Sequence, residues 1–351
     1  MFGKARVWRA AVARALAVST LGLAAFGAAA QSFADLATRN DPGRRARLTE
    51  AARREGSVTF YSSIPEKDMT VLAADFEKRY GVKVNIWRAS TVKVLQRLLA
   101  EKQANRWDFD AVDISGPEME ILHTEKLLQA VESDLHSELL PETLMPHHGW
   151  APQFLSVFVQ AYNTNAVKKA ELPRSYEDLL APRWKGMLGV EANDHEWYCG
   201  LLKHLGRDKG IKLFEDLVAR NGWSVRSGHT LLNNIVASGE VPLGLTVYSY
   251  MVDQARAKGA PIDWFAIDPL IGRSNGIGVS RRPPHPHAAL LFYEYMISDA
   301  QLLMQKMNYL SPVKKLASDL KGAKILYIDP AAPREEAEKC EADFNRLLKG
   351  R

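Results

Sequence analysis

The hydrophobic pattern of residues 57–128 changes regularly between two periods. Short runs rich in β-branched and aromatic residues predict strands, and the stretches between them, with apolar residues every three or four positions, predict helices. The predicted strands are Ser57–Tyr61, Val82–Trp87 and Phe109–Ile114, and the predicted helices are Glu66–Tyr80, Thr91–Ala104 and Pro117–Leu128. Strands that alternate with helices in this way indicate an α/β fold with mainly parallel sheets and helices on both faces.

A second α/β region follows a turn-rich stretch at residues 130–150, which carries several histidines. Its predicted strands are Leu155–Ala161, Met187–Val190, Pro242–Val247, Asp263–Ile267 and Gly276–Ser280, and its predicted helices are Glu196–Leu205, Lys209–Arg220, Leu231–Ala237, Ala288–Ile297 and Ala300–Met307. No flexible linker separates the two regions. We therefore expect two lobes between which the chain crosses more than once.

The first 30 residues have the order of a secretory signal peptide. Four basic residues stand at the front, an apolar run follows from Ala15 to Phe26, and small residues precede Gln31. The apolar run is shorter than the roughly 20 residues that span a bilayer. No cysteine lies near the expected cleavage site, so we expect a periplasmic protein without a lipid anchor.

Removing this segment changes the charge of the protein. The whole chain has 46 basic and 41 acidic residues, and residues 1–30 hold four of the basic ones and none of the acidic ones. The mature chain is therefore almost neutral, which argues against nucleic acid as a partner. Its two cysteines, Cys199 and Cys340, are far apart in sequence, so we expect two unpaired thiols, although the periplasm would permit a disulfide.

Small hydroxyl residues follow each predicted strand of the first region, directly before a helix. Ligands of open α/β sheets bind beyond the carboxyl ends of the strands, where the free N–H groups of a helix start favour an anion. Ser63 with Glu66, and Ser115 with Glu118, also match the capping-box spacing, which would close a helix without any ligand. The candidate ligand-binding residues of this region are Ser62, Ser63, Ser90, Thr91, Ser115 and Gly116.

The second region also carries candidates beyond its strands. Asp194 is suited to cap a helix, and Trp197 could stack on a ligand or simply be buried structure. Ser227 precedes another helix. Tyr248 and Tyr250 share a face only if the strand continues through both. We include all five among the candidate ligand-binding residues.

Signatures of enzymes are missing. The sequence has no HExxH, CxxC, GxSxG or P-loop motif, and the pair His195–Glu196 lacks the second histidine of a zinc motif. We therefore expect neither an enzyme nor a cofactor. A periplasmic enzyme that uses His195 beside Asp194 and Glu196 is kept as an alternative.

Several longer motifs occur in a fixed order over residues 55–315: VTFYSS, FEKRYGVKV, WDFDAVDIS, SVFVQAYNTNAV, SYEDLLAPRWKGMLGVEANDHEW, SGEVPLGLTVYSY and NYLSPVKK. With them the chain resembles the ferric-iron type of ABC-transporter solute-binding proteins, extracellular solute-binding family 1. The resemblance implies a monomeric two-lobed periplasmic binding protein of type II topology, which closes on a solute and delivers it to an inner-membrane permease. It also implies two hinge strands, near Phe154–Ala161 and near Trp264–Asp268.

These expectations divide the chain into three parts, with the ligand bound between the lobes. The signal peptide takes residues 1–30, lobe 1 takes residues 31–155 together with 268–351, and lobe 2 takes residues 156–267.

The nature of the solute is less constrained by the resemblance. Iron binders of this family use adjacent tyrosines, but here Ser249 separates Tyr248 from Tyr250, and only Tyr250 stands at a matching place. The main prediction is an organic or phosphorus-containing anion held by serines and helix ends. Ferric iron, with Tyr250 as a metal ligand, is the alternative. A cationic or aromatic solute, and a sensory protein that docks to a receptor instead of a permease, also stay open.

Overall fold

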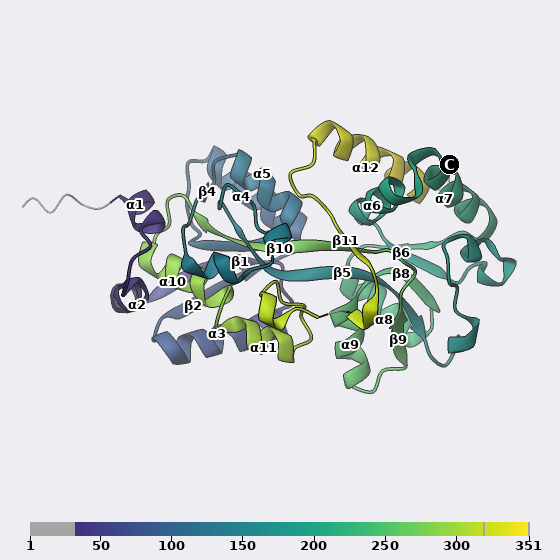
Figure 1. Cartoon of the computed structure of the whole chain (residues 1–351), viewed down its shortest axis with the longest axis horizontal. Helices are drawn as coiled ribbons and strands as arrows, with labels where there is room; N and C mark the ends of the chain where they lie inside the picture. Colours follow the sequence, from purple (N-terminus) through teal and green to yellow (C-terminus); the bar gives the residue numbers. More distant parts are fainter. Residues whose placement is uncertain (1–31, 319, 350–351) are drawn as a thin grey trace, which may run out of the picture.

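The computed structural model describes residues 32–318 and 320–349, and the predicted signal peptide lies outside them. The chain forms two lobes joined by one continuous mixed sheet, in the order β2-β1-β3-β10-β5-β8-β6-β7 (Figure 1). Within the described residues, no helix is both long and apolar enough to cross a membrane.

The sheet of lobe 1 uses the strands that the period-two pattern predicts. β1 (Ser57–Ser62) pairs in parallel with β2 (Lys83–Arg88) and β3 (Ala111–Ser115). Adjacent residues of β1 face opposite sides of the sheet, so Phe60 enters one core and Tyr61 the other. The helices on the Phe60 side are α2 (Arg44–Glu55), α3 (Glu66–Tyr80), α10 (Pro286–Met296) and α11 (Ala300–Lys306), and those on the Tyr61 side are α4 (Thr91–Gln103) and α5 (Gly116–Thr124).

Lobe 2 repeats this layered arrangement. β6 (Leu188–Glu191) lies between β7 (Ser224–Arg226) and β8 (Leu243–Tyr248), and it is parallel to both. The helices of one face are α6 (His195–Leu205) and α7 (Arg207–Asn221), and those of the other are α8 (His229–Ser238) and α9 (Ser249–Ala257). The α/β class and the two lobes expected from the sequence are confirmed.

Two long antiparallel strands, β5 (Ala151–Asn163) and β10 (Leu270–Ser280), run through both lobes (Figure 1). β10 pairs with β3 of lobe 1, whereas the far end of β5 pairs with β8 and with β9 (Ile262–Phe265) of lobe 2. Because these contacts are antiparallel, the sheet is mixed rather than mainly parallel. The second hinge strand was expected too early in the chain, because β9 belongs to lobe 2 and the crossing strand begins only at Leu270.

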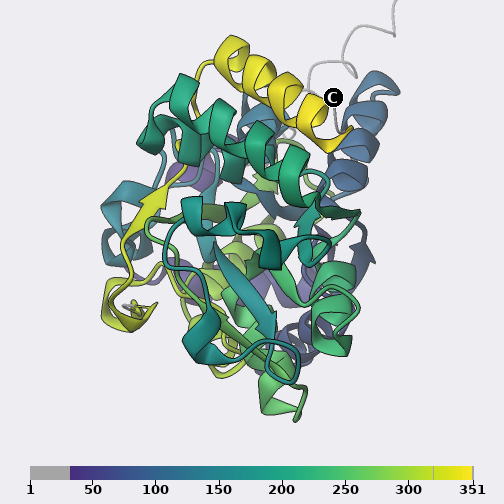
Figure 2. The ribbon, with the colours of Figure 1, turned by 90° about the vertical axis from the view of Figure 1, so that its right-hand side faces the viewer.

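The C-terminal segment returns to lobe 2, although the sequence analysis assigned residues 268–351 to lobe 1. After β11 (Ile325–Tyr327), which pairs with β10, α12 (Arg334–Leu348) packs on α6 and α7. Both views place α12, in yellow, beside these helices (Figures 1 and 2). Burial of its apolar residues, including Phe344, against α6 therefore decides its position.

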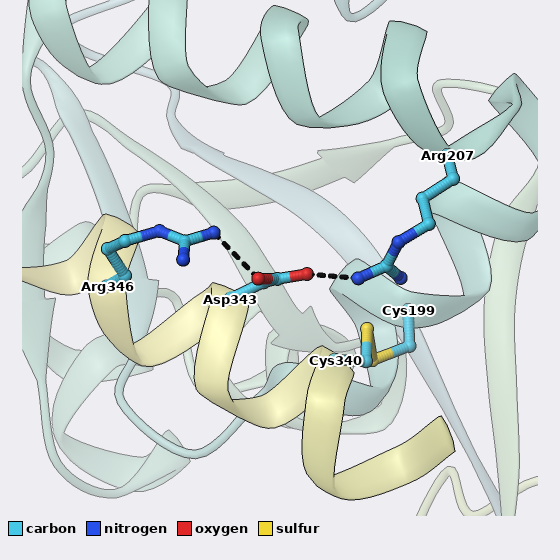
Figure 3. The surroundings of a disulfide bond; sticks show 5 residues. All are labelled: Cys199, Arg207, Cys340, Asp343 and Arg346. Carbon is cyan, nitrogen blue, oxygen red and sulfur yellow. Dashed lines mark hydrogen bonds and ion pairs between the residues drawn. A yellow bond between two sulfur atoms is a disulfide. The ribbon is translucent and has the colours of Figure 1, made fainter. Parts of the chain in front are cut away.

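A disulfide joins Cys199 of α6 to Cys340 of α12 (Figure 3). The expectation of two unpaired thiols is therefore wrong. The 141 residues that separate the cysteines in sequence are bridged because the last helix docks beside α6, with the two Cα atoms 6.0 Å apart. Asp343, one turn further on, accepts hydrogen bonds from Arg207 and Arg346 and adds an ionic contact to the same junction.

Candidate functional site

A largely buried arginine of the crossing strand β10, with 13% of its side chain exposed, stands at the centre of the candidate site. The guanidinium of Arg273 donates to the carboxylate of Glu196 at the start of α6 and to the hydroxyl of Tyr248 at the end of β8. Burial alone would lower the pKa of Arg273, but Glu196 and Tyr248 hold it well above its ordinary value. Its Nε atom is inaccessible and has no hydrogen-bond partner among the described residues.

Glu118 of α5 is the residue of lobe 1 that interacts electrostatically with this group. Its Oε2 atom is inaccessible and lacks a partner within the described part of the chain. Burial, and then the negative charge of Glu196, raise the pKa of Glu118 to about 7, against the opposite effect of Arg273. We call Glu118, Glu196, Tyr248 and Arg273 the interlobe cluster. It joins helices of both lobes across β10 and carries a proton that can be lost near neutral pH.

An aromatic column continues from the interlobe cluster. His229 stacks on Tyr248 with ring centroids 4.1 Å apart, Tyr248 on Tyr250 at 5.7 Å, and Tyr250 on Tyr309 at 4.5 Å. The hydroxyl of Tyr309 donates to Asp68 of α3 over 2.7 Å, so the column ends in lobe 1. Burial, followed by the charge of Asp68, raises the pKa of the Tyr250 phenol. The column therefore holds protonated phenols between carboxylates of the two lobes.

Lobe 2 also holds two carboxylates and an imidazole beside the column. One ligand atom from each of Glu191, Asp194 and His229 lies within 4.8 Å of the others. Nε2 of His229 lies 2.9 Å from Oδ1 of Asp194. The oxygens of Glu191 already accept from the amides of Gly228 and Asn193 and from the Asn193 side chain. Glu191 therefore joins two loops, and Asp194 and His229 are the groups freer to act.

The candidate hydroxyl residues of lobe 1 differ in burial and in their hydrogen bonds. Ser62 is fully buried, and its Oγ lies 3.4 Å from Asp113 and accepts from the amide of Ile64, so its hydrogen bonds are made within lobe 1. Burial raises the pKa of Asp113 well above its ordinary value. Ser63 is half-buried and uses its backbone, since its amide donates to the carbonyl oxygen of Asp113.

Neither predicted capping box forms. α3 begins after Pro65, because the chain continues past Ser63 before it turns into the helix. Ser115 does stand at the N-cap of α5, but its side chain makes no capping bond. Instead Ser115 Oγ lies 3.3 Å from the hydroxyl of Thr91, so the starts of α4 and α5 meet.

The remaining candidates lie in different surroundings. Gly116 is buried, and a Cβ atom there would come within 3.1 Å of the carbonyl oxygen of Ser274 on β10, so α5 starts tightly against the crossing strand. Ser90 and Ser227 are exposed. Asp194 is the N-cap residue of α6, but its carboxylate binds His229 rather than capping the helix.

The prediction that Trp197 stacks on a ligand has to be corrected. Its side chain is completely buried among Tyr176 and Phe214 in the core of lobe 2, so it is not a wall on which a ligand stacks. The residue of the first turn of α6 that is directed toward Arg273 is Glu196.

Comparison with known proteins decides the family. The model of the bacterial extracellular solute-binding proteins matches residues 71–326. The chain belongs to this family. Iron uptake protein A1 of Synechocystis sp. is 25% identical over 283 residues, 76% of this chain and 78% of the relative.

Solved structures show the same fold. Iron-bound HitA from Pseudomonas aeruginosa is 20% identical, with a TM-score of 0.65 over 84% of this chain and 96% of HitA. AfuA from Actinobacillus pleuropneumoniae, solved with fructose-6-phosphate, is 20% identical, with a TM-score of 0.67 over 84% of this chain and 97% of AfuA. These likenesses show that the chain has the two-lobed fold of periplasmic binding proteins, as the motifs suggested.

Sequence reasoning missed three central residues of this solute-binding protein. Arg273 was not among the candidates, Tyr309 stood in a motif noted only for the family, and Glu118 was considered only as a capping partner. Arg273 lies between Gly272 and Ser274 in a stretch that reads as a loop, so no local pattern marked it as a strand residue that needs partners.

Proposed function

We propose that this solute-binding protein captures ferric iron between its lobes and delivers it to an inner-membrane ABC permease. The observation that carries this proposal is the convergence of phenols and carboxylates on the aromatic column, from lobe 2 through Tyr248 and Tyr250 and from lobe 1 through Tyr309 and Asp68. From the sequence an anion was the main prediction and ferric iron the alternative, so the preference between the two ligands is now reversed.

The chemistry of the donors supports a hard cation. Phenolate and carboxylate oxygens suit Fe³⁺, and the carboxylates around the column outnumber the single buried arginine. The interruption of the tyrosine pair by Ser249 is offset by stacking, since Tyr248 and Tyr250 have nearly parallel rings, with an interplanar angle of 12°. Burial keeps both phenols protonated without the ion, so iron binding releases protons and strengthens as pH rises.

The names of relatives point in the same direction. The Synechocystis relative is an iron uptake protein, and the HitA structure contains iron. Binding would shift the molecule toward a closed form by movement about β5 and β10, the strands that both lobes share. We further propose export by residues 1–30, a monomer free of a lipid anchor, and a permease as the receiving partner.

Visible absorption of ferric-loaded protein tests the proposal. The iron-free mature protein, titrated with ferric citrate, is expected to acquire a tyrosinate charge-transfer band. Tyr250→Phe is expected to weaken or abolish this band. Tyr162→Phe is a matched control, because Tyr162 is also buried but packs on Phe265 at the β9 edge. A protein that stays colourless with ferric ion would refute iron as the solute, and a band unaffected by Tyr250→Phe would refute Tyr250 as its ligand.

A small anion is the second candidate, favoured by two observations. Nε of Arg273 is buried without a partner among the described residues, and Thr91 and Ser115 hold hydroxyls 3.3 Å apart where two helices start. AfuA, of similar fold, was solved with a sugar phosphate. Isothermal calorimetry with inorganic phosphate and with fructose-6-phosphate separates the candidates: an anion-binding protein loses affinity on Thr91→Val but not on Tyr250→Phe.

A further inference from the structure

A second group of metal-ligating side chains lies in lobe 1, outside the interlobe cluster. Glu132, His136 and His148 belong to the turn-rich segment that follows β4 (Leu128–Gln129). One ligand atom from each lies within 4.8 Å of the other two. Nδ1 of His148 is 2.9 Å from Oε1 of Glu132, and the two imidazole rings meet edge to face with centroids 4.9 Å apart.

His136 is the buried member of this group, with 7% of its surface exposed. Its Nε2 lies 2.8 Å from the hydroxyl of Tyr293 on α10. Its Nδ1 is inaccessible and has no hydrogen-bond partner among residues 32–318 and 320–349. Leaving such a buried atom unpaired is unfavourable, so a bound group is the natural explanation.

The hydrogen bond of His136 to Tyr293 also suits a metal ligand. With Nε2–H donated to Tyr293, the lone pair lies on Nδ1, and a hydrogen bond of this kind fixes the orientation of metal-binding histidines.

We propose that Glu132, His136 and His148 form a site for a borderline divalent cation, with Zn²⁺ as the ion that best suits two imidazoles and one carboxylate. Ligands about 2.0–2.2 Å from a tetrahedral ion lie about 3.4 Å from one another. This spacing falls between the 2.9 Å and 4.8 Å limits found here, so small side-chain rotations suffice. Glu132 and His148 are partly exposed, which leaves the fourth position to water.

The site would fasten the turn-rich segment to lobe 1. The two ends of this segment are already in contact, because the amide of Val131 donates to the carbonyl oxygen of His148 over 3.0 Å. A metal on His136, itself bonded to Tyr293, would tie these ends to α10. This role is separate from the solute carried between the lobes, and it does not depend on the proposed iron function.

Calorimetric titration of Zn²⁺ into the untagged, chelator-treated mature protein tests the site. The wild type is expected to bind one Zn²⁺ at this group, and Co²⁺ is expected to give the visible bands of a tetrahedral site. His148→Ala should weaken binding at least tenfold. Tyr293→Phe keeps the ring but removes the hydroxyl, and should weaken binding by about 10- to 100-fold.

Two controls separate this site from other metal binding. His204→Ala removes an exposed histidine of α6 and should change nothing. Tyr250→Phe impairs the proposed iron site and should leave the Zn²⁺ affinity intact. The proposal is overturned if the wild type binds no Zn²⁺, if His148→Ala binds as tightly as the wild type, or if Tyr250→Phe or His204→Ala lowers the affinity as much as His148→Ala does.

Discussion

Removing the disulfide between Cys199 and Cys340 is expected to destabilise the protein and release its last helix. The bond closes a loop of 141 residues and holds α12 on α6. The other contacts of this junction are modest, because the side chain of Arg207 is 38% exposed and that of Arg346 is 55% exposed. Such pairs contribute about 0.2–1 kcal/mol each.

The magnitude follows from the length of the closed loop. For a sequence separation of 141 residues, the loss of chain entropy in the unfolded state corresponds to roughly 5 kcal/mol at 25 °C. Residual structure in the unfolded chain reduces this figure, so we expect a loss of about 2–5 kcal/mol of unfolding free energy. The apolar contacts of Phe344 persist, and they are expected to keep part of α12 docked.

Urea unfolding and limited proteolysis measure the two effects. The oxidised wild type is compared with the same protein after reduction and with the double variant Cys199→Ala/Cys340→Ala. Both should unfold at a lower urea concentration and be cleaved sooner after residue 316. Asp343→Asn is the matched control and should lose about 1 kcal/mol or less. Equal midpoints for oxidised and reduced wild type would contradict the argument.

Three further predictions concern charge and packing. The pKa of the Glu118 carboxyl is raised to about 7 in the folded protein. The unfolding free energy therefore falls as the pH rises from the ordinary pKa of a glutamate through 7. Urea unfolding at each pH should show that the unfolding free energy of Glu118→Gln, relative to that of the wild type, rises by about 3 kcal/mol between pH 5 and pH 8. Unfolding free energies of the two proteins that change in parallel with pH would exclude this role of Glu118. At Gly276 an added Cβ would lie 2.4 Å from the Trp150 ring, so Gly276→Ala should cost about 1–3 kcal/mol and lower the melting temperature; an unchanged melting temperature would contradict this. Arg44→Met breaks the buried pair Arg44–Glu294 and should lower the unfolding free energy by about 3–5 kcal/mol. In a double-mutant cycle, adding Glu294→Leu should largely restore it, because the uncompensated charge is then removed. Failure of the second change to restore stability would contradict this explanation.

Local periodicity predicted most of the elements that build the two lobes. The predicted helix Glu66–Tyr80 has the observed bounds, β1 is one residue longer than predicted, and β2 is shifted by one residue at both ends. The first half of β10 escaped prediction, because Gly272 through Gly276 includes glycines, an arginine, a serine and an asparagine. Such residues read as a loop unless both neighbouring strands are known.

The candidate site was predicted in part. Tyr248 ends a strand and Tyr250 belongs to a helix, the case in which the two phenols were expected to diverge, yet their rings stack 5.7 Å apart. Trp197 was misjudged because a position near the start of a helix does not specify whether the side chain faces the core or the partner lobe. That choice depends on where the following helix begins.

The sequence by itself determined the class of the protein, since its strand and helix periods and its ordered motifs depend on neighbours close in the chain. The tertiary structure decided which distant residues meet. It placed Cys340 against Cys199 and set Arg273 between Glu196 and Tyr248. The physical reason is that long-range pairing follows from burying apolar faces and compensating buried charges across the whole molecule, and no local pattern records those partners.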